Sequence, residues 1–305
     1  MNDPLDGNEF TVIHGDNVEV MATLPPRCVD HVVCSPPFPL LYAYTSEMSD
    51  IGNSEGTAEM KLHLSFFYKQ LVRVVKPGRV VLIHVMQIPR LKRAGGQGLS
   101  DFRGLNIRLA ERAGLVYSYD WLIRANPQSQ AIRTKSRELQ FAGLESDRAR
   151  CRGALGSYLI KFMVPGDNDV AIDSPEQVTR NDWIDWAEDR WEIRETDTLN
   201  TRRAKSESDT RHICPLQLGT YERAIRLYTN PGEIVMDPFA GIGSCGFVAL
   251  GGTSPVTKRA VLDERRFLGI ELKPEWHAEA IRNCETAIVS RQARQRTLFD
   301  VLETS

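Results

Sequence analysis

The sequence of 305 residues predicts an α/β fold, with a mostly parallel sheet, helices on both faces and an antiparallel pair of strands at one edge. Short apolar runs typical of buried strands alternate with segments of helical spacing, which favours parallel strands joined by helices. Two further runs, 117–124 and 157–164, are expected to form the antiparallel edge pair.

Apolar spacing and stop signals predict the following strands and helices, given in chain order. The predicted strands are 10–14, 29–34, 80–86, 117–124, 157–164, 233–236 and 266–272. The predicted helices are 18–23, 57–75 (ended by Lys76-Pro77-Gly78), 102–113 (ended by Gly114), 246–250 and 274–289. The tail beyond residue 290 is polar and is expected to be loosely held.

The segment Cys34-Ser35-Pro36-Pro37-Phe38 follows a buried run where a strand should end. Its two prolines prevent helix and ladder pairing and make a stiff turn. Such a turn suits the binding of an exocyclic amine on a flat heterocycle: the Ser35 hydroxyl and the Pro36 carbonyl accept its hydrogens, while Phe38 stacks on the ring. Taken alone, the segment is equally consistent with an ordinary loop.

A second turn, residues 232–244, joins a predicted strand to a helix and contains Asp237-Pro238-Phe239-Ala240-Gly241-Ile242-Gly243-Ser244. Glycine there lets the backbone approach a ligand closely. The next strand ends at Glu271, where a ribose diol would be bound. The third glycine of the dinucleotide fingerprint is missing and no Walker lysine follows, which favours S-adenosylmethionine, although a nicotinamide or nucleotide site remains an alternative.

Together, the two turns resemble those of the amino-methyltransferases of DNA, which methylate exocyclic amines of cytosine or adenine. The catalytic turn precedes the cofactor turn, as in the circularly permuted beta group of that family. Residues 212–217 resemble the segment over the methionine part of the cofactor, and residues 13–16 resemble the strand end that faces the adenine. The resemblance implies a circularly permuted, Rossmann-like S-adenosylmethionine-dependent methyltransferase sheet with an inserted target-recognition region.

The resemblance also implies residue roles. Ser35, Pro36, Pro37 and Phe38 would be catalytic and would act on a base flipped out of the duplex. Asp237 would accept from the amino group of the cofactor, Glu271 would bind its ribose, Leu272 would flank its adenine and Asp16 would accept from the adenine amine. The remaining implied cofactor residues are Cys34, Cys214, Pro215, Leu216, Pro238, Phe239, Ala240, Gly241, Gly243 and Ser244. Asp16 and Asp237 are also consistent with helix caps, and Glu271 with a surface acid.

Ser35 bears on which base is methylated. Serine at this position resembles the cytosine 4-amino enzymes, whereas adenine enzymes usually carry Asp, so cytosine is favoured and adenine is the alternative. Rival classes are a dinucleotide-dependent oxidoreductase, a methyltransferase acting on RNA or protein, and an inactive DNA-binding module.

Two insertions are the expected DNA-facing region. Residues 120–161 hold eight Lys/Arg against four Asp/Glu, which favours a phosphate-contacting surface, with a solvated loop as the alternative. In 167–211, Trp183, Trp186 and Trp191 are expected to pack inward from a small helix as a mini-core, with a base-stacking platform as the alternative. The predicted DNA-binding residues are Arg133, Lys135, Arg137, Arg150, Arg152, Arg202, Arg203 and Lys205.

These assignments divide the chain as follows: 1–125 is the catalytic half of the core, 126–155 the basic insertion, 156–165 an edge strand, 166–211 the target-recognition insertion, 212–290 the cofactor half and 291–305 the tail.

Composition agrees with this interpretation. The net charge is only −2, so any DNA-binding face must be local. The six cysteines form no Cys-x-x-Cys pair, which favours free thiols in a reducing cytoplasm and no metal site. No signal peptide or membrane-length apolar run is evident. Expected partners are double-stranded DNA, a second copy in a homodimer and, in a restriction-modification system, a cognate endonuclease. The expected location is the cytoplasm of a bacterium or phage-infected cell.

Overall fold

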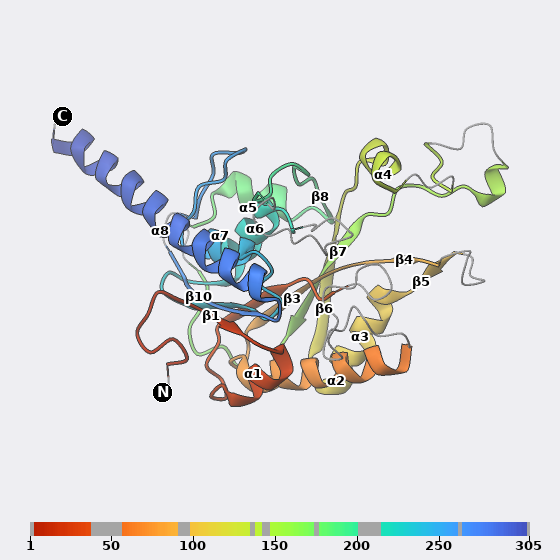
Figure 1. Ribbon diagram of the computed structural model, residues 1–305, viewed down its shortest axis with the longest axis horizontal. Coiled ribbons are helices and arrows are strands. Elements are labelled where there is room, and N and C mark those ends of the chain that lie inside the picture. Colours follow the sequence, from red (N-terminus) through yellow and green to blue (C-terminus); the bar gives the residue numbers. More distant parts are fainter. Residues whose placement is uncertain are drawn as a thin grey trace.

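The computed structural model describes residues 3–37, 57–90, 98–134, 138–141, 147–173, 177–200, 215–261 and 264–303. Within them lies one eight-stranded sheet and a two-stranded ribbon (Figure 1). From edge to edge, the sheet contains β1 (Phe10–His14), β10 (Arg266–Glu271), β9 (Ile234–Asp237), β2 (His31–Cys34), β3 (Val80–Met86), β7 (Ser157–Met163), β6 (Val116–Ile123) and β8 (Arg190–Trp191).

Strands β1, β10, β9, β2 and β3 run parallel. β7 is antiparallel to both β3 and β6, so β6 again points in the direction of β3. The predicted fold class, including the antiparallel pair, is confirmed. The short strand β8 was not predicted; it pairs parallel with β6 and forms the edge of the sheet.

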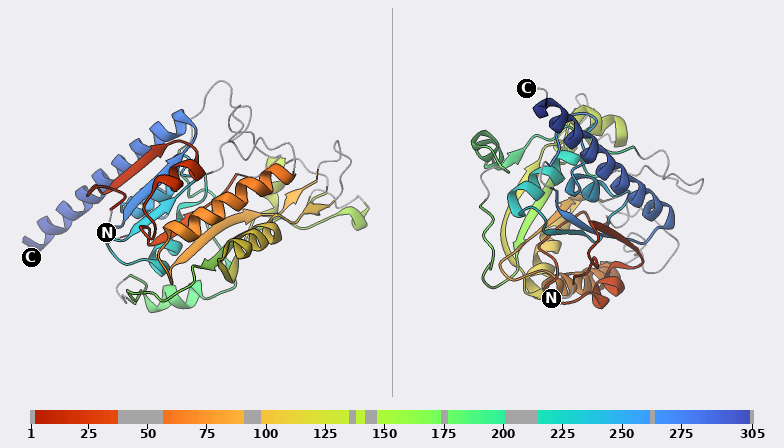
Figure 2. Two further views of the ribbon diagram at one scale, coloured as in Figure 1. Left: turned by 90° about the horizontal axis from the view of Figure 1, so that it is seen from below. Right: turned by 90° about the vertical axis from the view of Figure 1, so that its left-hand side faces the viewer.

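Helices cover both faces of the sheet (Figures 1 and 2). One face carries α1 (Asn17–Thr23), α2 (Thr57–Val74) and α3 (Phe102–Ala113). The other carries α5 (Arg180–Trp186), α6 (Leu218–Tyr228), α7 (Ser244–Ala249) and α8 (Pro274–Glu303). Alternate residues of each buried strand enter the two apolar cores, as in Val32 toward the α2 side and Val33 toward the α6 side.

Local signals explain several helix ends. The Asp101 carboxylate caps α3 by accepting from the Gly104 amide, and Gly114 ends the helix at a φ of 109°, a left-handed conformation that favours glycine. The predicted helix end at residue 289 was wrong: α8 continues to Glu303 and extends beyond the sheet in Figure 1. That the tail is loosely held stays a prediction. Polar residues with good helix propensity continue a helix without a stop signal, and none occurs here.

The amino ends of the central strands are joined by buried charges. The Asp30 carboxylate before β2 accepts from Lys76 at 2.5 Å and from the Ile234 amide of β9 at 2.9 Å. Arg79, before β3, pairs with Glu233, before β9, at 2.5 Å. These pairs fix β2, β3 and β9 side by side at one end, which leaves the opposite, carboxyl end of the sheet for the turns.

Smaller elements lie in the connections. The ribbon consists of β4 (Ile88–Pro89) and β5 (Leu99–Ser100) and follows β3. The first insertion contains α4 (Pro127–Thr134) and the 3-10 turn η3 (Arg148–Arg150), and α4 projects from the end of β6 in Figure 1. In the part of the chain that the structure describes, no helix combines the length and the apolar character needed to cross a bilayer.

Candidate functional site

The two predicted turns lie next to each other at the carboxyl ends of adjacent strands. β2 pairs with β9 through His31 opposite Val235 and Val32 opposite Met236, so the strands end together at Cys34 and Asp237. Burial, and after it the charge of Asp237, raises the pKa of the Cys34 thiol, as expected for close neighbours. The helices that follow these strands, α2 and α7, pack on opposite faces of the sheet. Such a switch point leaves a crevice in which α/β sheets bind ligands.

The catalytic turn starts directly after β2. Ser35 and Pro37 are partly buried and Pro36 is buried; Phe38 lies outside the described residues. The Ser35 hydroxyl lies 3.1 Å from Nδ1 of His84 and 3.4 Å from the His84 carbonyl oxygen. Burial lowers the pKa of His84 to about 4, so this imidazole is neutral near pH 7.

The glycine turn after β9 is held by backbone bonds. The Ala240 amide donates to the Ile270 carbonyl of β10 at 2.9 Å, and the Gly243 amide donates to Ala240 at 2.8 Å. Gly241 and Gly243 have φ of 55° and 80°, a region that glycine adopts without strain. The Phe239 ring packs 5.0 Å from the Phe67 ring of α2. These contacts hold the turn against β10 and α2.

The two glycines differ in their surroundings. A Cβ on Gly243 would lie 2.9 Å from the Cα of Ala280 in α8, so close helix packing requires glycine there. Of the residues that the structure describes, a Cβ on Gly241 would meet only the Phe239 carbonyl oxygen, at 4.0 Å, so this part of the chain leaves open space in front of Gly241. Gly241 is therefore the position at which a ligand can approach the backbone.

Glu271 links the glycine turn to the end of β10. One carboxylate oxygen accepts from the Gly241 amide at 2.8 Å and the other from the Lys273 amide at 2.9 Å. Its side chain is nearly buried, so the alternative of a surface acid is wrong. The predicted ribose role stays a prediction.

Asp237 is a buried carboxyl held by two local donors. The Phe239 amide donates to it at 3.0 Å and the Tyr221 hydroxyl of α6 at 3.3 Å. Burial raises its pKa from 3.8 to about 7, while both hydrogen bonds act in the opposite direction. Asp237 therefore stabilises the turn. Its contact with the amino group of the cofactor stays a prediction.

The adenine side of the predicted site is formed by the ends of β1 and β10. Nε2 of His14 lies 2.9 Å from the Leu272 carbonyl oxygen, and the Gly15 amide donates to the backbone carbonyl oxygen of Glu271 at 3.0 Å. Asp16 caps α1 by accepting from the Val18 and Glu19 amides at 2.9 and 3.0 Å. Both bonds use Oδ1, so the adenine role proposed for this carboxylate would fall to Oδ2.

The predicted methionine segment is described from residue 215 onward, and Cys214 lies outside the described residues. Pro215 is partly buried and Leu216 is buried in the α6-side core. They lead into α6, which local sequence reasoning missed and whose Tyr221 reaches Asp237.

The site has unused polar capacity that fits S-adenosylmethionine. Among the described residues, the buried Oγ of Ser244 has no hydrogen-bond partner, and neither has Oδ1 of Asn17, next to Asp16. With the open space at Gly241, these groups fit a ligand that carries an amino acid moiety at one end and a nucleoside at the other. The described part of the chain holds no group of three or more His, Cys, Asp or Glu side chains able to bind a metal ion.

Most predicted DNA-binding side chains are not described. Lys135, Arg137, Arg202, Arg203 and Lys205 lie outside the described residues, and only the backbone of Arg133 in α4 and Arg150 in η3 is described. Arg152 lies 3.9 Å from the Glu138 carboxylate. The insertion leaves the sheet after β6, at the same edge as the catalytic turn, because β6 runs in the direction of β3.

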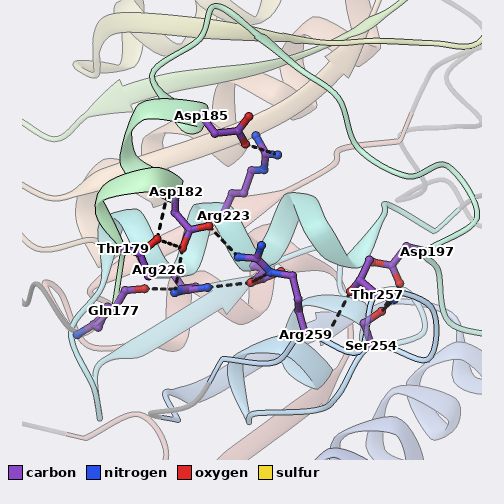
Figure 3. Close-up of polar contacts among 11 residues, drawn as sticks. Gln177, Thr179, Asp182, Asp185, Asp197, Arg223, Arg226, Ser254, Thr257 and Arg259 are labelled. Atoms are coloured by element: carbon purple, nitrogen blue, oxygen red, sulfur yellow. Dashed lines mark hydrogen bonds and ion pairs between the residues drawn. The ribbon is translucent and has the colours of Figure 1, made fainter.

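The second insertion is fixed to the core by a polar cluster (Figure 3). Asp182 of α5 pairs with Arg259 at 3.2 Å and with Arg226 of α6 at 3.6 Å. The Ser254 hydroxyl donates to the buried Asp197 carboxylate at 2.5 Å, and the Leu218 amide donates to the Asp197 carbonyl at 2.9 Å. Residues 177–200 thereby hold the start of α6.

The tryptophan prediction is corrected in part. Trp186 and Trp191 are buried, but Trp183 is 63% exposed. Trp191 stacks on Trp121 of β6 with ring centroids 4.9 Å apart, and both belong to the α6-side core. Trp186 and Trp191 thus join the main core and do not form the expected mini-core, and Trp183 belongs to neither.

Comparison with known proteins identifies the family of this chain. Residues 29–282 match the family model N6_N4_Mtase, described as DNA methylase. The type II methyltransferase M.BamHI of Bacillus amyloliquefaciens is 25% identical over 244 residues, 76% of this chain and 49% of that protein. The match therefore spans about half the length of this curated relative.

Solved structures show the same fold. The PvuII DNA methyltransferase, described as cytosine-N4-specific, superposes with a TM-score of 0.64 at 19% identity, covering 90% of this chain and 86% of that one. TTHA0409 of Thermus thermophilus, determined with S-adenosyl-L-methionine, gives a TM-score of 0.62 at 19% identity, covering 91% and 95%.

Proposed function

This chain belongs to the DNA methylase family whose model it matches, and on that premise we propose that it methylates the exocyclic 4-amino group of cytosine in duplex DNA, with S-adenosylmethionine as methyl donor. One observation carries the proposal: the Ser35 turn and the Gly241 turn end adjacent parallel strands at the switch point of the sheet. A site for an amine and a site for the donor therefore share one crevice.

The residues of the catalytic turn orient the amine. An amine conjugated with its ring is a poor nucleophile, and hydrogen bonds to the Ser35 hydroxyl and the Pro36 carbonyl favour a more tetrahedral nitrogen. Bound S-adenosylmethionine supplies a methyl group on a positively charged sulfur. Alignment of the amine with that methyl group then provides much of the acceleration.

The amine is inside the stack of a duplex, so the base must be flipped out at a cost of roughly a few kcal/mol. Stacking on Phe38 is proposed to offset part of this cost, since base–aromatic stacking contributes about 1–3 kcal/mol.

The cofactor residues are proposed from the fit of the second turn. Gly241, Gly243 and Ser244 would hold the methionine moiety together with Pro238, Phe239, Ala240, Pro215 and Leu216. Glu271 would bind the ribose, and Asp16 and Leu272 the adenine. The acceptor Ser244 Oγ and the open space at Gly241 support this arrangement.

Duplex DNA is proposed to lie along the carboxyl edge of the sheet, because the basic insertion 126–155 emerges there. Phosphate contacts make such binding weaken steeply with salt. Residues 177–200 are fixed to α6, so we assign target contacts to the first insertion and to residues 201–211 rather than to 177–200.

Cytosine is proposed because of Ser35, and the cytosine-N4-specific description of the PvuII enzyme supports the choice. A neutral hydroxyl can also accept from the adenine 6-amine, so adenine is the alternative. Family membership favours methyl transfer over a dinucleotide-dependent oxidation. A homodimer, a cognate endonuclease and a cytoplasmic location belong to the same proposal.

Single-molecule sequencing of DNA from cells that express the protein tests the proposal, because it reports the modified base and its sequence context together. We expect N4-methylcytosine at one recurrent sequence, absent from cells that carry the Ser35→Ala variant. N6-methyladenine would select the alternative. Unmodified DNA, together with methyl transfer by the purified protein to RNA or protein only, would contradict the proposal.

A further inference from the structure

His84 lies beside the catalytic hydroxyl, although no motif in the sequence singles it out. β2 and β3 pair with Cys34 opposite Ile83, so Ser35 and His84 come next in the same register. Their side chains meet at 3.1 Å, between Ser35 Oγ and His84 Nδ1. The contact thus arises from the pairing of two parallel strands whose ends are fixed by the buried charges at Asp30 and Glu233.

The imidazole is suited to accept a hydrogen from this hydroxyl. Burial is the cause of its lowered pKa, about 4, so the neutral ring keeps a lone pair on one nitrogen near pH 7. Within the ranges that the structure describes, the second acceptor near the hydroxyl is the His84 carbonyl oxygen, which lies farther away, at 3.4 Å. The hydrogen therefore has its nearer acceptor in Nδ1, which requires the tautomer protonated at Nε2.

After methyl transfer, the amine nitrogen is positively charged and must release one proton. The amine nitrogen forms a bond to the methyl carbon while the bond from that carbon to sulfur breaks, and the positive charge moves from sulfur to nitrogen. The methylated nitrogen must then lose a hydrogen as a proton. A cationic nitrogen attached to a heteroaromatic ring is a stronger acid than an imidazolium ion, so even a weakly basic imidazole suffices.

We propose that His84 positions the Ser35 hydroxyl as a hydrogen-bond acceptor for the amine and receives, through that hydroxyl, the proton that the methylated amine loses. The inference rests on the proposed function. The N–H bond of the amine breaks, its proton binds Ser35 Oγ, and the former hydroxyl proton binds His84 Nδ1. The positive charge ends on the imidazolium, which releases its proton to water.

The neutral His84 side chain also affects the charge beside the pocket for the base. A carboxylate beside the partly buried Ser35 would bring a charge to this position, whereas the imidazole of His84, which is also partly buried, is uncharged near pH 7. His84 therefore provides a proton acceptor for the reaction without placing a permanent charge beside the pocket for the base.

The test compares His84→Asn and His84→Leu with the wild type on duplex DNA. Asparagine places an acceptor oxygen where Nδ1 lies but cannot take up a proton, and leucine removes both properties. Single-turnover transfer, KM for DNA and cofactor affinity in the absence of DNA are measured for each. His31→Asn is the matched control, because His31 is a buried histidine of β2 whose Nδ1 lies 2.8 Å from the Val80 carbonyl oxygen, away from Ser35.

We expect both His84 variants to lose about 10²–10⁴-fold in the transfer rate, with KM and cofactor affinity changed by less than about threefold. The control should transfer at about the wild-type rate. Full transfer by His84→Asn would overturn the proton-accepting role, and full transfer by both variants would overturn the whole inference. Should His84→Leu not fold, His84→Asn alone decides. Failure of the wild type to methylate DNA would instead contradict the proposed function.

Discussion

The raised pKa of Asp237 makes the stability of this protein depend on pH. The carboxyl is completely buried, and its pKa rises from 3.8 to about 7. Between these values the folded protein holds a proton on Asp237 that the unfolded chain has lost, so the contribution of Asp237 to the free energy of unfolding falls as the pH rises. The difference in pKa corresponds to about 4 kcal/mol in total, at about 1.4 kcal/mol for each pH unit.

The perturbation is Asp237→Asn, which keeps an acceptor for the Phe239 amide and removes the titration. Urea denaturation of both proteins, without cofactor, at several pH values from 5 to 8 measures the effect. From pH 5 to 7 the wild type should lose about 2 kcal/mol of unfolding free energy relative to the variant, and little more above pH 7. A difference between the two proteins that stays constant from pH 5 to 8 would refute the reasoning.

A matched variant tests the cause. Tyr221→Phe keeps the carboxyl and removes the hydroxyl that donates to it at 3.3 Å. This hydrogen bond lowers the pKa of Asp237, so its loss should raise the pKa further and extend the pH-dependent decline above pH 7. A decline that ends at a lower pH than in the wild type would contradict the assigned contact.

The other predictions concern the turns and the second insertion. Ser35→Ala should bind the cofactor within about twofold of the wild type in calorimetry and lose about 10²-fold or more in single-turnover transfer; transfer at the parent rate would contradict the catalytic assignment. Gly241→Val should lose cofactor binding because its side chain enters the open space in front of residue 241. Gly7→Val is the control, because Gly7 also has a positive φ, of 84°, and no described atom lies within 4 Å of its Cβ position; this variant should bind the cofactor normally. Equal cofactor binding by both variants would count against the site. Gly243→Val should also lose cofactor binding, but here the melting temperature should fall as well, because the new side chain collides with α8. An unchanged melting temperature would contradict the close packing of Gly243 against Ala280. Asp197→Ala should lower the free energy of unfolding by about 1–3 kcal/mol, because it leaves the buried Ser254 hydroxyl without this acceptor. Glu192→Ala is the control: it breaks an exposed pair with Arg124 and should change the free energy of unfolding by less than about 1 kcal/mol. Similar values for the two variants would show that the polar cluster in Figure 3 does not fix the second insertion to the core.

The sequence predicted the parallel core well because its signals are local. Runs of consecutive apolar residues marked the buried strands, and the glycines at 241 and 243 marked the turn after β9. The shared edge of the two turns followed from a general property of parallel sheets, since carboxyl ends of neighbouring strands lie together.

The parts that escaped prediction depend on contacts between distant segments. β8 has two residues, and only its pairing with β6 and the stacking of Trp191 on Trp121 define it. The contact of His84 with Ser35 arises from strand register, which no local pattern specifies. Asp237 was predicted to face the cofactor, but its burial and its contact with Tyr221 depend on α6, which lay outside every motif.

The most direct test of the account is a crystal structure with S-adenosylhomocysteine, the product of the donor, bound to the protein. We predict electron density across the carboxyl ends of β9 and β10, with the amino acid end beside Gly241 and Ser244 and the sulfur directed toward Ser35 at the end of β2. Density at the amino ends of these strands, or with its sulfur directed away from Ser35, would contradict a shared crevice.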